Sequence, residues 1–323
     1  MKKYLIILLS SLSILFTQAW VKEYEPKDKS DLGKLLFFDP ILSRDSTISC
    51  GSCHKPEFAF ADTAKFSIGV GGRLGVRNTP TSMNLRFQES FFWDGRVKTL
   101  EEQALAPIEN PDEMDLSIED AVMRLRKSKT YSAYFRKLFN ADPTAQSLAE
   151  ALAAFQRRLE TSDSPFDNWK FYDKPELVSD AVKRGFEIFS GRKGKCTDCH
   201  FGSDFRQNEF RNIGLFDGKK FNDSGRASIT HLNEDIGKFK TPTLRNIAVT
   251  WPYMHNGMFK TLMEVIEFYN DPEKIIPGSI NRDTVLAKPL GLTEQEKKDL
   301  EAFLLALTDK QFERSTTKKY FGY

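Results

Sequence analysis

Hydrophobic residues recur along much of the chain at the three- and four-residue spacing of amphipathic helices. From Leu148 to Leu159, apolar side chains return after four, seven and eleven positions. A second stripe near the end of the chain consists of Leu300, Phe303, Leu304 and Leu307. Such spacing places apolar side chains on one face of a helix. Strand-like alternation is scarce, so the pattern predicts a mainly α-helical protein.

Local signals mark where several helices begin and where they are absent. Capping boxes, in which a threonine is followed three residues later by a glutamate, occur at Thr99 with Glu102, Thr261 with Glu264, and Thr293 with Glu296. Residues 67–84 are rich in glycine and polar residues and predict a long irregular loop. Residues 161–176, where two prolines bracket a polar stretch, are expected to form a linker.

The first residues have the pattern of a secretory signal peptide. Two lysines precede an apolar run from Leu5 to Phe16, and a small-residue cleavage site follows at Ala19. We therefore expect residues 1–19 to be removed during export to the periplasm, so that the mature chain begins near Trp20. The apolar run is short for a bilayer span, so no stable membrane insertion is expected after cleavage. An uncleaved anchor is the alternative.

Length and charge narrow the class of protein further. A mature chain of about 300 residues exceeds what one core usually organises, which favours two domains. We place them at residues 20–165 and 166–323. The chain has 47 basic and 45 acidic residues, a formal net charge of +2 that two signal-peptide lysines account for. This balance does not favour a nucleic-acid partner, whose phosphates require a clustered basic face.

The chain contains a degenerate internal repeat centred on its four cysteines. "CGSCH" supplies Cys50, Cys53 and His54, and "CTDCH" supplies Cys196, Cys199 and His200. A short helical pattern precedes each motif, "GKLLF" at 33–37 and "GFEIF" at 185–189, and aromatic residues follow at Phe58 and Phe60 and at Phe201 and Phe205. The repeat predicts two related domains, each built around one motif.

Cys-x-x-Cys-His is the attachment motif of c-type haem. The two thiols form thioethers with one haem, and the adjacent histidine binds its iron. A disulfide within a pair would close a very small loop, a zinc ribbon spaces its pairs by roughly 15–20 residues, and a thioredoxin-like motif does not explain the repeated histidine. We therefore predict two c-type haems, with His54 and His200 as iron ligands.

Longer motifs accompany the haem motifs. "RNTPTSMN", "FFWDGRVKTLEEQALAPIENPDEM" and "FKTPTLRNIAVTWPYMHNGMFKTLMEVIEFY" occur in this order with the two haem motifs. In these segments the chain resembles the bacterial di-haem cytochrome c peroxidase family, which includes the MauG branch. The resemblance implies two cytochrome c-like domains, each with one covalently bound c-type haem. It also implies a peroxide-reactive haem in the first domain, an electron-transfer haem in the second and a calcium ion between them.

The resemblance also implies roles for individual residues. Gln103 and Glu113 match the pair that assists proton transfer during cleavage of peroxide, and Trp93 matches a tryptophan between the two haems. Taken without the family, Gln103 is an exposed helix residue, Glu113 a turn carboxylate and Trp93 a core aromatic. Asn78, Thr250 and Pro252 match the calcium position, whose amide and backbone oxygens suit Ca²⁺. His255 is expected to contact a haem propionate, and His231 to be a surface histidine.

Two positions depart from the pattern of many family members. Val70 lies where those proteins carry a second histidine for the first haem, so this haem is expected to be five-coordinate at rest. Tyr269 lies where proteins that accept electrons from small cytochromes carry a methionine, and the MauG branch also has tyrosine there. We expect Tyr269 to bind the second iron. A buried core tyrosine is the alternative, and other possible ligands are Met254, Met258 and Met263.

The resemblance predicts an enzyme that reduces hydrogen peroxide with electrons from a small periplasmic donor, such as a cytochrome c or a cupredoxin. A MauG-like enzyme, which uses peroxide to oxidise a protein or another organic substrate, is a second interpretation. A di-haem electron carrier without catalysis is a third, and rapid spectral change on addition of peroxide would exclude it.

Overall fold

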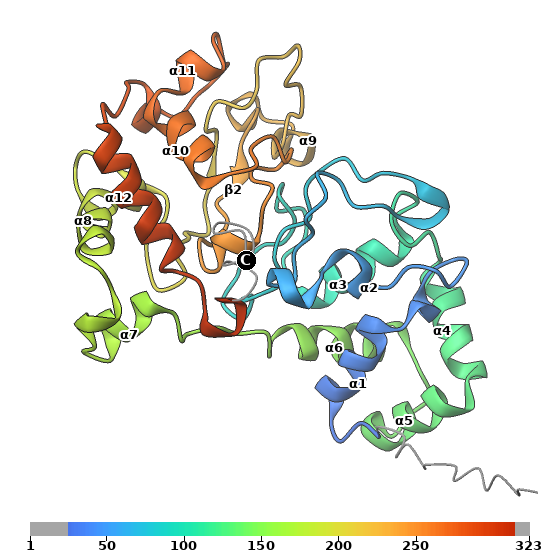
Figure 1. Ribbon diagram of the computed structural model, residues 1–323. Helices are drawn as coiled ribbons and strands as arrows, with labels where there is room; N and C mark the ends of the chain where they lie inside the picture. The colour runs from blue at the N-terminus through green and yellow to red at the C-terminus, as the bar shows by residue number, and fades with distance from the viewer. Residues whose placement is uncertain (1–24, 314–323) are drawn as a thin grey trace, which may run out of the picture.

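A computed structural model describes residues 25–313, and the predicted signal segment lies outside this range. The described chain is mainly helical, and its two halves lie side by side (Figure 1). The first half contains α1 (Lys29–Phe38), α2 (Cys50–Cys53), α3 (Leu100–Glu109), α4 (Ile118–Lys127), α5 (Lys129–Phe139) and α6 (Ala145–Gln156). The second half contains α7 (Pro165–Phe171), α8 (Asp180–Ser190), α9 (Ala227–Thr230), α10 (Leu262–Asn270), α11 (Pro272–Ile275) and α12 (Glu294–Leu305).

The remaining regular structure is short. Strands β1 (Phe210–Arg211) and β2 (Phe239–Lys240) pair antiparallel, with Phe210 opposite Lys240. The 3₁₀ turns are η1 (Pro40–Leu42), η2 (Pro56–Phe58), η3 (Val70–Gly72), η4 (Pro175–Leu177), η5 (Cys196–Asp198), η6 (Asn233–Asp235), η7 (Ile247–Val249), η8 (Thr284–Leu286) and η9 (Lys310–Phe312). The predicted mainly helical class is confirmed.

The helix starts follow from local hydrogen bonds. Thr99, Thr261 and Thr293 are the N-caps of α3, α10 and α12, and in each case both bonds of the capping box are present. These bonds satisfy amide groups that the first helical turn leaves without partners. Most of each apolar stripe lies on the buried face of α6 or α12, whereas Leu159 and Leu307 are buried just beyond the helix ends. Residues 67–84 are irregular apart from η3, as predicted.

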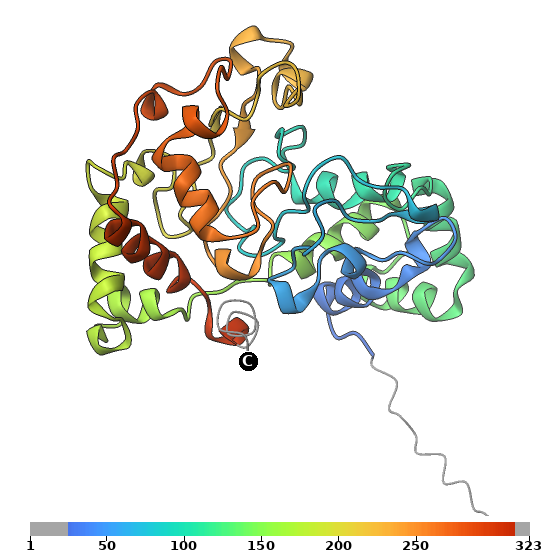
Figure 2. The ribbon, with the colours of Figure 1, turned by 45° about the horizontal axis from the view of Figure 1, so that its top comes forward.

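The helix that precedes each cysteine motif packs against the last long helix of its own half. Helix α1 packs across α6 in the first half, and α8 packs across α12 in the second half (Figure 2). The backbones approach so closely that a Cβ atom on Gly33 would lie 1.9 Å from the Ala151 carbonyl oxygen, and one on Gly185 would lie 2.0 Å from the Asp299 carbonyl oxygen. Glycine is therefore required at both crossings, which confirms that the repeat is structural.

Each crossing is surrounded by its own group of three phenylalanines, and the two groups correspond. In each half, two of the three flank the cysteine motif at positions given by the repeat, and the third comes from the long helix. In the first half, the ring centroids lie 5.1–6.2 Å apart, and in the second half 4.9–6.0 Å apart. The first group is Phe37, Phe60 and Phe155, and the second is Phe189, Phe205 and Phe303. Each group forms the centre of one of two large hydrophobic cores.

The connection between the halves is more ordered than the sequence suggests. Within residues 161–176, which we expected to be a linker, Ser164 caps α7, and Phe166 of this helix packs into the second core. The polar residues of the segment are also used, because the Asp167 carboxylate accepts two hydrogen bonds, both 2.9 Å long, from the buried guanidinium of Arg245. None of the helices among residues 25–313 is long and apolar enough to cross a membrane.

Candidate functional site

Each cysteine motif opens into a cavity. The first cavity has a volume of about 240 Å³ and is lined by Cys50, Cys53 and His54. The second has a volume of about 200 Å³ and is lined by Cys196, Cys199 and His200. Residues from segments far apart in the sequence complete both linings. The repeated motif therefore produces two separate pockets of similar construction.

Both motif histidines are held in the same orientation. The Nδ1 atom of His54 lies 2.8 Å from the Phe60 carbonyl oxygen, and the Nδ1 atom of His200 lies 2.8 Å from the Phe205 carbonyl oxygen. A carbonyl oxygen only accepts hydrogen bonds, so each Nδ1 carries the hydrogen and each Nε2 presents a lone pair. The two phenylalanines have positive φ angles of 54° and 50°. This uncommon conformation recurs at both sites.

The electrostatic environment keeps both imidazoles neutral, as an iron ligand must be. Burial lowers the pKa of His54 and lowers the pKa of His200 to about 4. Ser82, whose Oγ atom lies 3.0 Å from Nδ1 of His54, is a further partner at the first site. Such a second contact fixes the ring plane of a ligating histidine.

The cysteines do not form a thiolate metal site. Burial raises the pKa of Cys50 and of Cys196 to about 12, so unmodified thiols here would be protonated at neutral pH. Among residues 25–313, no group of three histidine, cysteine or acidic side chains is arranged to hold a metal ion. The paired thiols, the oriented imidazole and the largely apolar linings fit a covalently attached haem in each cavity.

Gln103 and Glu113 lie together at the first cavity. Gln103 projects from α3, and its Oε1 atom is buried without a hydrogen-bond partner among the described residues. Glu113 follows the end of the same helix, and its Oε1 atom accepts a 2.7 Å hydrogen bond from Nδ2 of Asn110. Burial raises the pKa of Glu113, although the bond from Asn110 opposes this shift. The cavity thus contains an unpartnered acceptor and a carboxyl group that retains its proton to higher pH than usual.

The loop at residues 67–84 packs directly against the Glu113 segment. The amide of Val70 donates a 2.8 Å hydrogen bond to the Glu113 carbonyl oxygen, and the Val70 side chain is fully buried. A Cβ atom on Gly69 would lie 2.2 Å from the Asp112 carbonyl oxygen, so only glycine permits this approach. All four histidines are described, and His54 is the only one that lines the first cavity.

Trp93 lines both cavities and is held at two points. Its indole Nε1 donates a 2.8 Å hydrogen bond to the Asn78 carbonyl oxygen, and its own carbonyl oxygen accepts a 2.8 Å bond from the amide of Lys240. The indole also meets the ring of His255 edge to face, with centroids 6.4 Å apart. The two pockets therefore share one tryptophan in their linings.

The second cavity is lined by two of the four candidate iron ligands. Tyr269, on α10, and Met254 line this cavity, whereas Met258 and Met263 do not. Burial raises the pKa of the Tyr269 hydroxyl. His255 also lines this cavity, and its ring stacks on Phe239 with centroids 3.7 Å apart. Burial lowers the pKa of His255 to about 4, so its ring is neutral.

The three residues matched to calcium also lie at the second cavity. Asn78, Thr250 and Pro252 all contribute to its lining. The side-chain amide of Asn78 donates hydrogen bonds of 3.2 and 3.4 Å to the carbonyl oxygens of Ala64 and Lys65. This leaves the Asn78 side-chain oxygen as an available hard ligand, although no carboxylate cluster accompanies it within residues 25–313. His231 lies at neither cavity.

Sequence reasoning missed a lysine at the centre of the site. Lys240 lines both cavities, and its amide holds the carbonyl of Trp93. Gln88, also unnoticed, lines the first cavity and accepts a 3.2 Å hydrogen bond from Lys240 Nζ. Lys240 and Ser82 do lie in the long motifs quoted above, Lys240 in "FKTPTLRN" and Ser82 in "RNTPTSMN". Within these motifs, however, nothing in the local pattern distinguishes the two residues from surface residues.

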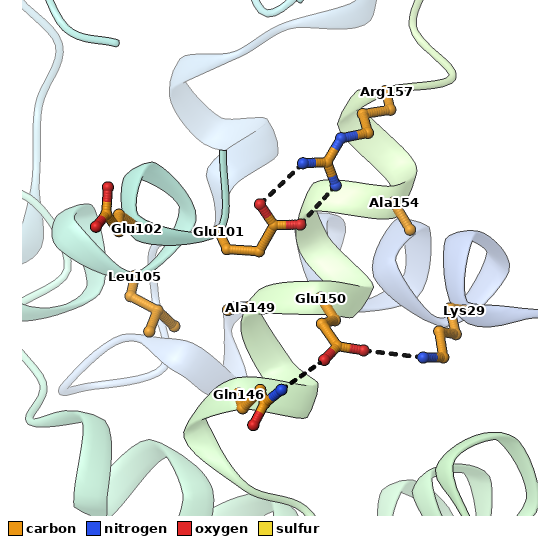
Figure 3. Close-up of a pocket in the computed structure, with 9 residues that line it drawn as sticks. All are labelled: Lys29, Glu101, Glu102, Leu105, Gln146, Ala149, Glu150, Ala154 and Arg157. Carbon is orange, nitrogen blue, oxygen red and sulfur yellow. Dashed lines mark hydrogen bonds and ion pairs between the residues drawn. The ribbon is translucent and has the colours of Figure 1, made fainter. Parts of the chain in front are cut away.

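A third hollow, on the outer surface between α1, α3 and α6, is of a different kind (Figure 3). Arg157 and Glu101 form two hydrogen bonds of 2.6 and 2.8 Å, and Glu150 binds Lys29 at 2.8 Å and Gln146 at 3.0 Å. The charged side chains that line the hollow are therefore already engaged, since Glu102 takes part in the N-terminal cap of α3 and the others form ion pairs. This groove stabilises helix packing and offers no free group for chemistry.

Two haem-type pockets in one helical chain, with an aromatic side chain between them, define a two-centre c-type cytochrome. The lining of the first pocket also contains a glutamine and a carboxyl group. Comparison with known proteins identifies the family to which the chain belongs.

The family profile described as di-haem cytochrome c peroxidase matches residues 27–174. The methylamine utilization protein MauG of Methylorubrum extorquens is 39% identical over 286 residues, which cover 87% of this chain and 78% of the relative. Cytochrome-c peroxidase IdrP1 of Denitromonas iodatirespirans is 38% identical over 315 residues, which cover 87% and 81%. A crystal structure of a MauG-like protein associated with microbial copper homeostasis has a TM-score of 0.82 at 32% identity, covering 90% of this chain and 93% of that one.

The protein therefore belongs to the di-haem cytochrome c peroxidase family, as its motifs predict. Membership and the two Cys-x-x-Cys-His motifs together imply two c-type haems. The relatives include both MauG proteins and cytochrome c peroxidases, so they define an oxidoreductase of the peroxidase type without selecting between these two activities.

Proposed function

We propose that the protein reduces hydrogen peroxide to water at the first cavity, with electrons that enter through the second. Each turnover consumes one peroxide, two protons and two electrons and releases two water molecules. The observation that carries this proposal is the composition of the first cavity. It combines the haem motif with Gln103 and Glu113, and Trp93 connects it to the second cavity.

The side chains of the first cavity supply proton transfer. Cys50, Cys53 and His54 would hold a haem here, and this haem would supply the iron that reacts with peroxide. The unpartnered Oε1 of Gln103 accepts a hydrogen bond from the peroxide and orients it. Glu113, whose pKa is raised by burial, takes a proton from one oxygen of the peroxide and returns it to the other.

The second cavity provides the route for electrons. Trp93 borders both pockets, so its ring offers a path between them without a gap of solvent. The expected donor is a small periplasmic protein such as a cytochrome c or a cupredoxin, in line with the predicted export signal. A calcium ion held by Asn78, Thr250 and Pro252 would stiffen the segments that border the second cavity.

Substitution of the carboxyl group tests the proposal. In Glu113→Gln, we expect the rate of the reaction with peroxide, followed by stopped-flow absorption, to fall by about 10²- to 10⁴-fold, the usual contribution of a general acid–base group. Glu109→Gln is the matched control, since this exposed carboxylate lies on the same helix and lines neither cavity. A Glu113→Gln protein that reacts at the wild-type rate would refute the role, and a wild-type protein that shows no spectral response would indicate a carrier.

A second candidate function is favoured by one observation. Tyr269, and not a methionine, faces the second cavity from α10 at the position expected for an axial ligand. A phenolate ligand favours ferric and higher-valent iron, which makes the second haem a poorer acceptor of electrons. The protein would then resemble its MauG relatives, and the oxidising equivalents of peroxide would pass to a protein or other organic substrate.

Electron paramagnetic resonance separates these alternatives. If Tyr269 binds iron, the resting protein shows one high-spin and one low-spin haem, and Tyr269→Phe alters the low-spin signal. Tyr131→Phe is a suitable control because Tyr131 lies at neither cavity and its hydroxyl binds Asp39 at 2.6 Å. An unchanged low-spin signal excludes ligation. Rapid oxidation of reduced cytochrome c by the wild type would favour the first function over the second.

A further inference from the structure

Two cations that line the cavities lack a carboxylate partner in the described part of the chain, Lys195 and Lys240, and of these only Lys240 lines both cavities. The guanidinium groups that line the cavities are paired: Arg77 with Asp94 and Asp223, Arg96 with Asp94, and Arg211 with Glu209 and Asp283. The Lys195 ammonium donates a 3.4 Å hydrogen bond to the Val285 carbonyl oxygen. Among residues 25–313, no carboxylate lies within 4.0 Å of the Lys240 ammonium, whose hydrogen-bond partner is the neutral side chain of Gln88. Removing an ammonium from water without an anionic partner is costly. The structure thus contains an uncompensated charge at the boundary of both cavities.

The contacts of Lys240 extend into an ion network that is short of one negative charge. Gln88 Oε1 also accepts a 3.2 Å hydrogen bond from Arg206, and Arg206 binds Asp204 at 3.3 Å. Arg245 continues the chain through contacts of 3.2 Å with Asp204 and 2.9 Å with Asp167. The connected groups comprise three cations and two carboxylates. The chain ends at Lys240, so the missing anion belongs in a cavity.

The first cavity is the side toward which the ammonium is held. Lys240 borders both pockets, but Gln88, which binds its Nζ atom, lines only the first. The Lys240 backbone is fixed by strand β2 and by its bond to the carbonyl of Trp93. A porphyrin of the haem type carries two carboxylate groups, which are the only anions such a prosthetic group brings into a pocket lined mainly by apolar atoms.

We propose that Lys240 binds a carboxylate of the prosthetic group in the first cavity and is the cation that joins this group to the ion network between the two halves. The contact would form a charge-assisted hydrogen bond in a partly buried site. The surroundings of Lys240 support this proposal. Its pKa is lowered to about 7, mainly by burial and secondly by the positive charge of Arg206, as expected of an ammonium without a carboxylate partner. A carboxylate partner would restore the ammonium form. Lys240 acts here as a positioning residue, and the proposal depends on haem occupancy of the first cavity.

Potentiometry of the mature di-haem protein tests the assignment. In Lys240→Gln, loss of the positive charge leaves the carboxylate uncompensated and favours ferric iron. We expect the reduction equilibrium of the first haem to weaken about tenfold, which is about 59 mV for one electron. Lys240→Arg should restore most of the potential, and Lys240→Met replaces Lys240→Gln if the latter is not recovered with two haems. Lys238→Gln is the control, because Lys238 binds Asp235 at 3.0 Å and lines neither cavity.

The two potentials are assigned with a His54→Met variant, in which the change of ligand moves the potential of the first haem. A selective fall in that potential in Lys240→Gln, with a shift of its propionate bending band in the resonance Raman spectrum, supports the proposal. Unchanged potentials, or a change confined to the second haem, would overturn it. Peroxide takes no part in these measurements, so a protein that does not react with peroxide would refute the proposed function and leave this result intact.

Discussion

The helix crossing at Gly33 provides a quantitative test of how the haem pockets are supported. Replacement of Gly33 by alanine would place a methyl group 1.9 Å from the Ala151 carbonyl oxygen and 3.0 Å from Cβ of Phe155. To reach 3.4 Å, the start of an ordinary contact, α1 and α6 must separate by about 1.5 Å. Both obstacles belong to backbone or to the base of a side chain, so rotation of a flexible group cannot relieve them.

This separation would disturb the first core. Leu36 and Phe37 on α1 are almost completely buried and pack against α6, and Phe37 also belongs to the aromatic group beside His54. Overpacking of a rigid interior costs about 1–3 kcal/mol. We expect the upper value, because the added methyl group would contact the backbone of α6, which cannot move aside as a flexible side chain does. For a chain of this size, about 3 kcal/mol lowers the melting temperature by about 6–12 °C.

Thermal unfolding of the holoprotein, followed by circular dichroism and by the haem absorption band, measures this effect. Gly185→Ala should behave similarly in the second half, where the carbonyl of Asp299 is the obstacle. Gly75→Ala is the matched control, since its nearest atoms would lie at 3.7 and 4.0 Å and its φ angle is not positive. A melting temperature for Gly33→Ala within about 1 °C of the Gly75→Ala value would refute the close-packed crossing.

Two further predictions concern the join between the halves and the link between the cavities. Burial alone would raise the pKa of Asp167, but hydrogen bonds and the charge of Arg245 hold it below the usual value. Asp167→Asn removes the two-bond carboxylate partner of the buried Arg245 guanidinium and leaves only its 3.2 Å ionic contact with Asp204, so it should lower the unfolding free energy by about 3 kcal/mol at pH 7. In denaturant titrations, the difference in unfolding free energy between wild type and Asp167→Asn should narrow below about pH 4, because the carboxylate loses its charge as the pH falls through its native pKa. A difference that does not depend on pH would contradict the pairing. Trp93→Phe removes the hydrogen bond to the Asn78 carbonyl oxygen, which should lower the unfolding free energy by about 1 kcal/mol. The same substitution should slow oxidation of the second haem after mixing with peroxide. An unchanged stopped-flow rate would show that the electrons take another path.

Much of the local structure was predictable because it depends on neighbours in the sequence. The capping box at Thr99 and Glu102 joins residues three positions apart, and the Cys-x-x-Cys-His motif places its reactive groups within five. The repeat also includes Phe60 and Phe205, which pack at the two helix crossings, because they follow their histidines at nearly equal distances, although it includes Phe58 and Phe201 as well. The linker was less well predicted, since the polar residues of 161–176 suggested exposure, whereas Asp167 is buried against Arg245.

The sequence by itself therefore determined the class of protein, its helices, its duplicated organisation and the residues that attach haem. Only the tertiary structure placed Trp93 at both cavities and brought Lys240 to Gln88, which lies 152 positions away. It alone revealed that this lysine ends a network short of one anion. The physical reason is that motifs and caps are stabilised by bonds within a single turn. A cavity and its charge balance, in contrast, arise from the packing of distant segments, which no local pattern records.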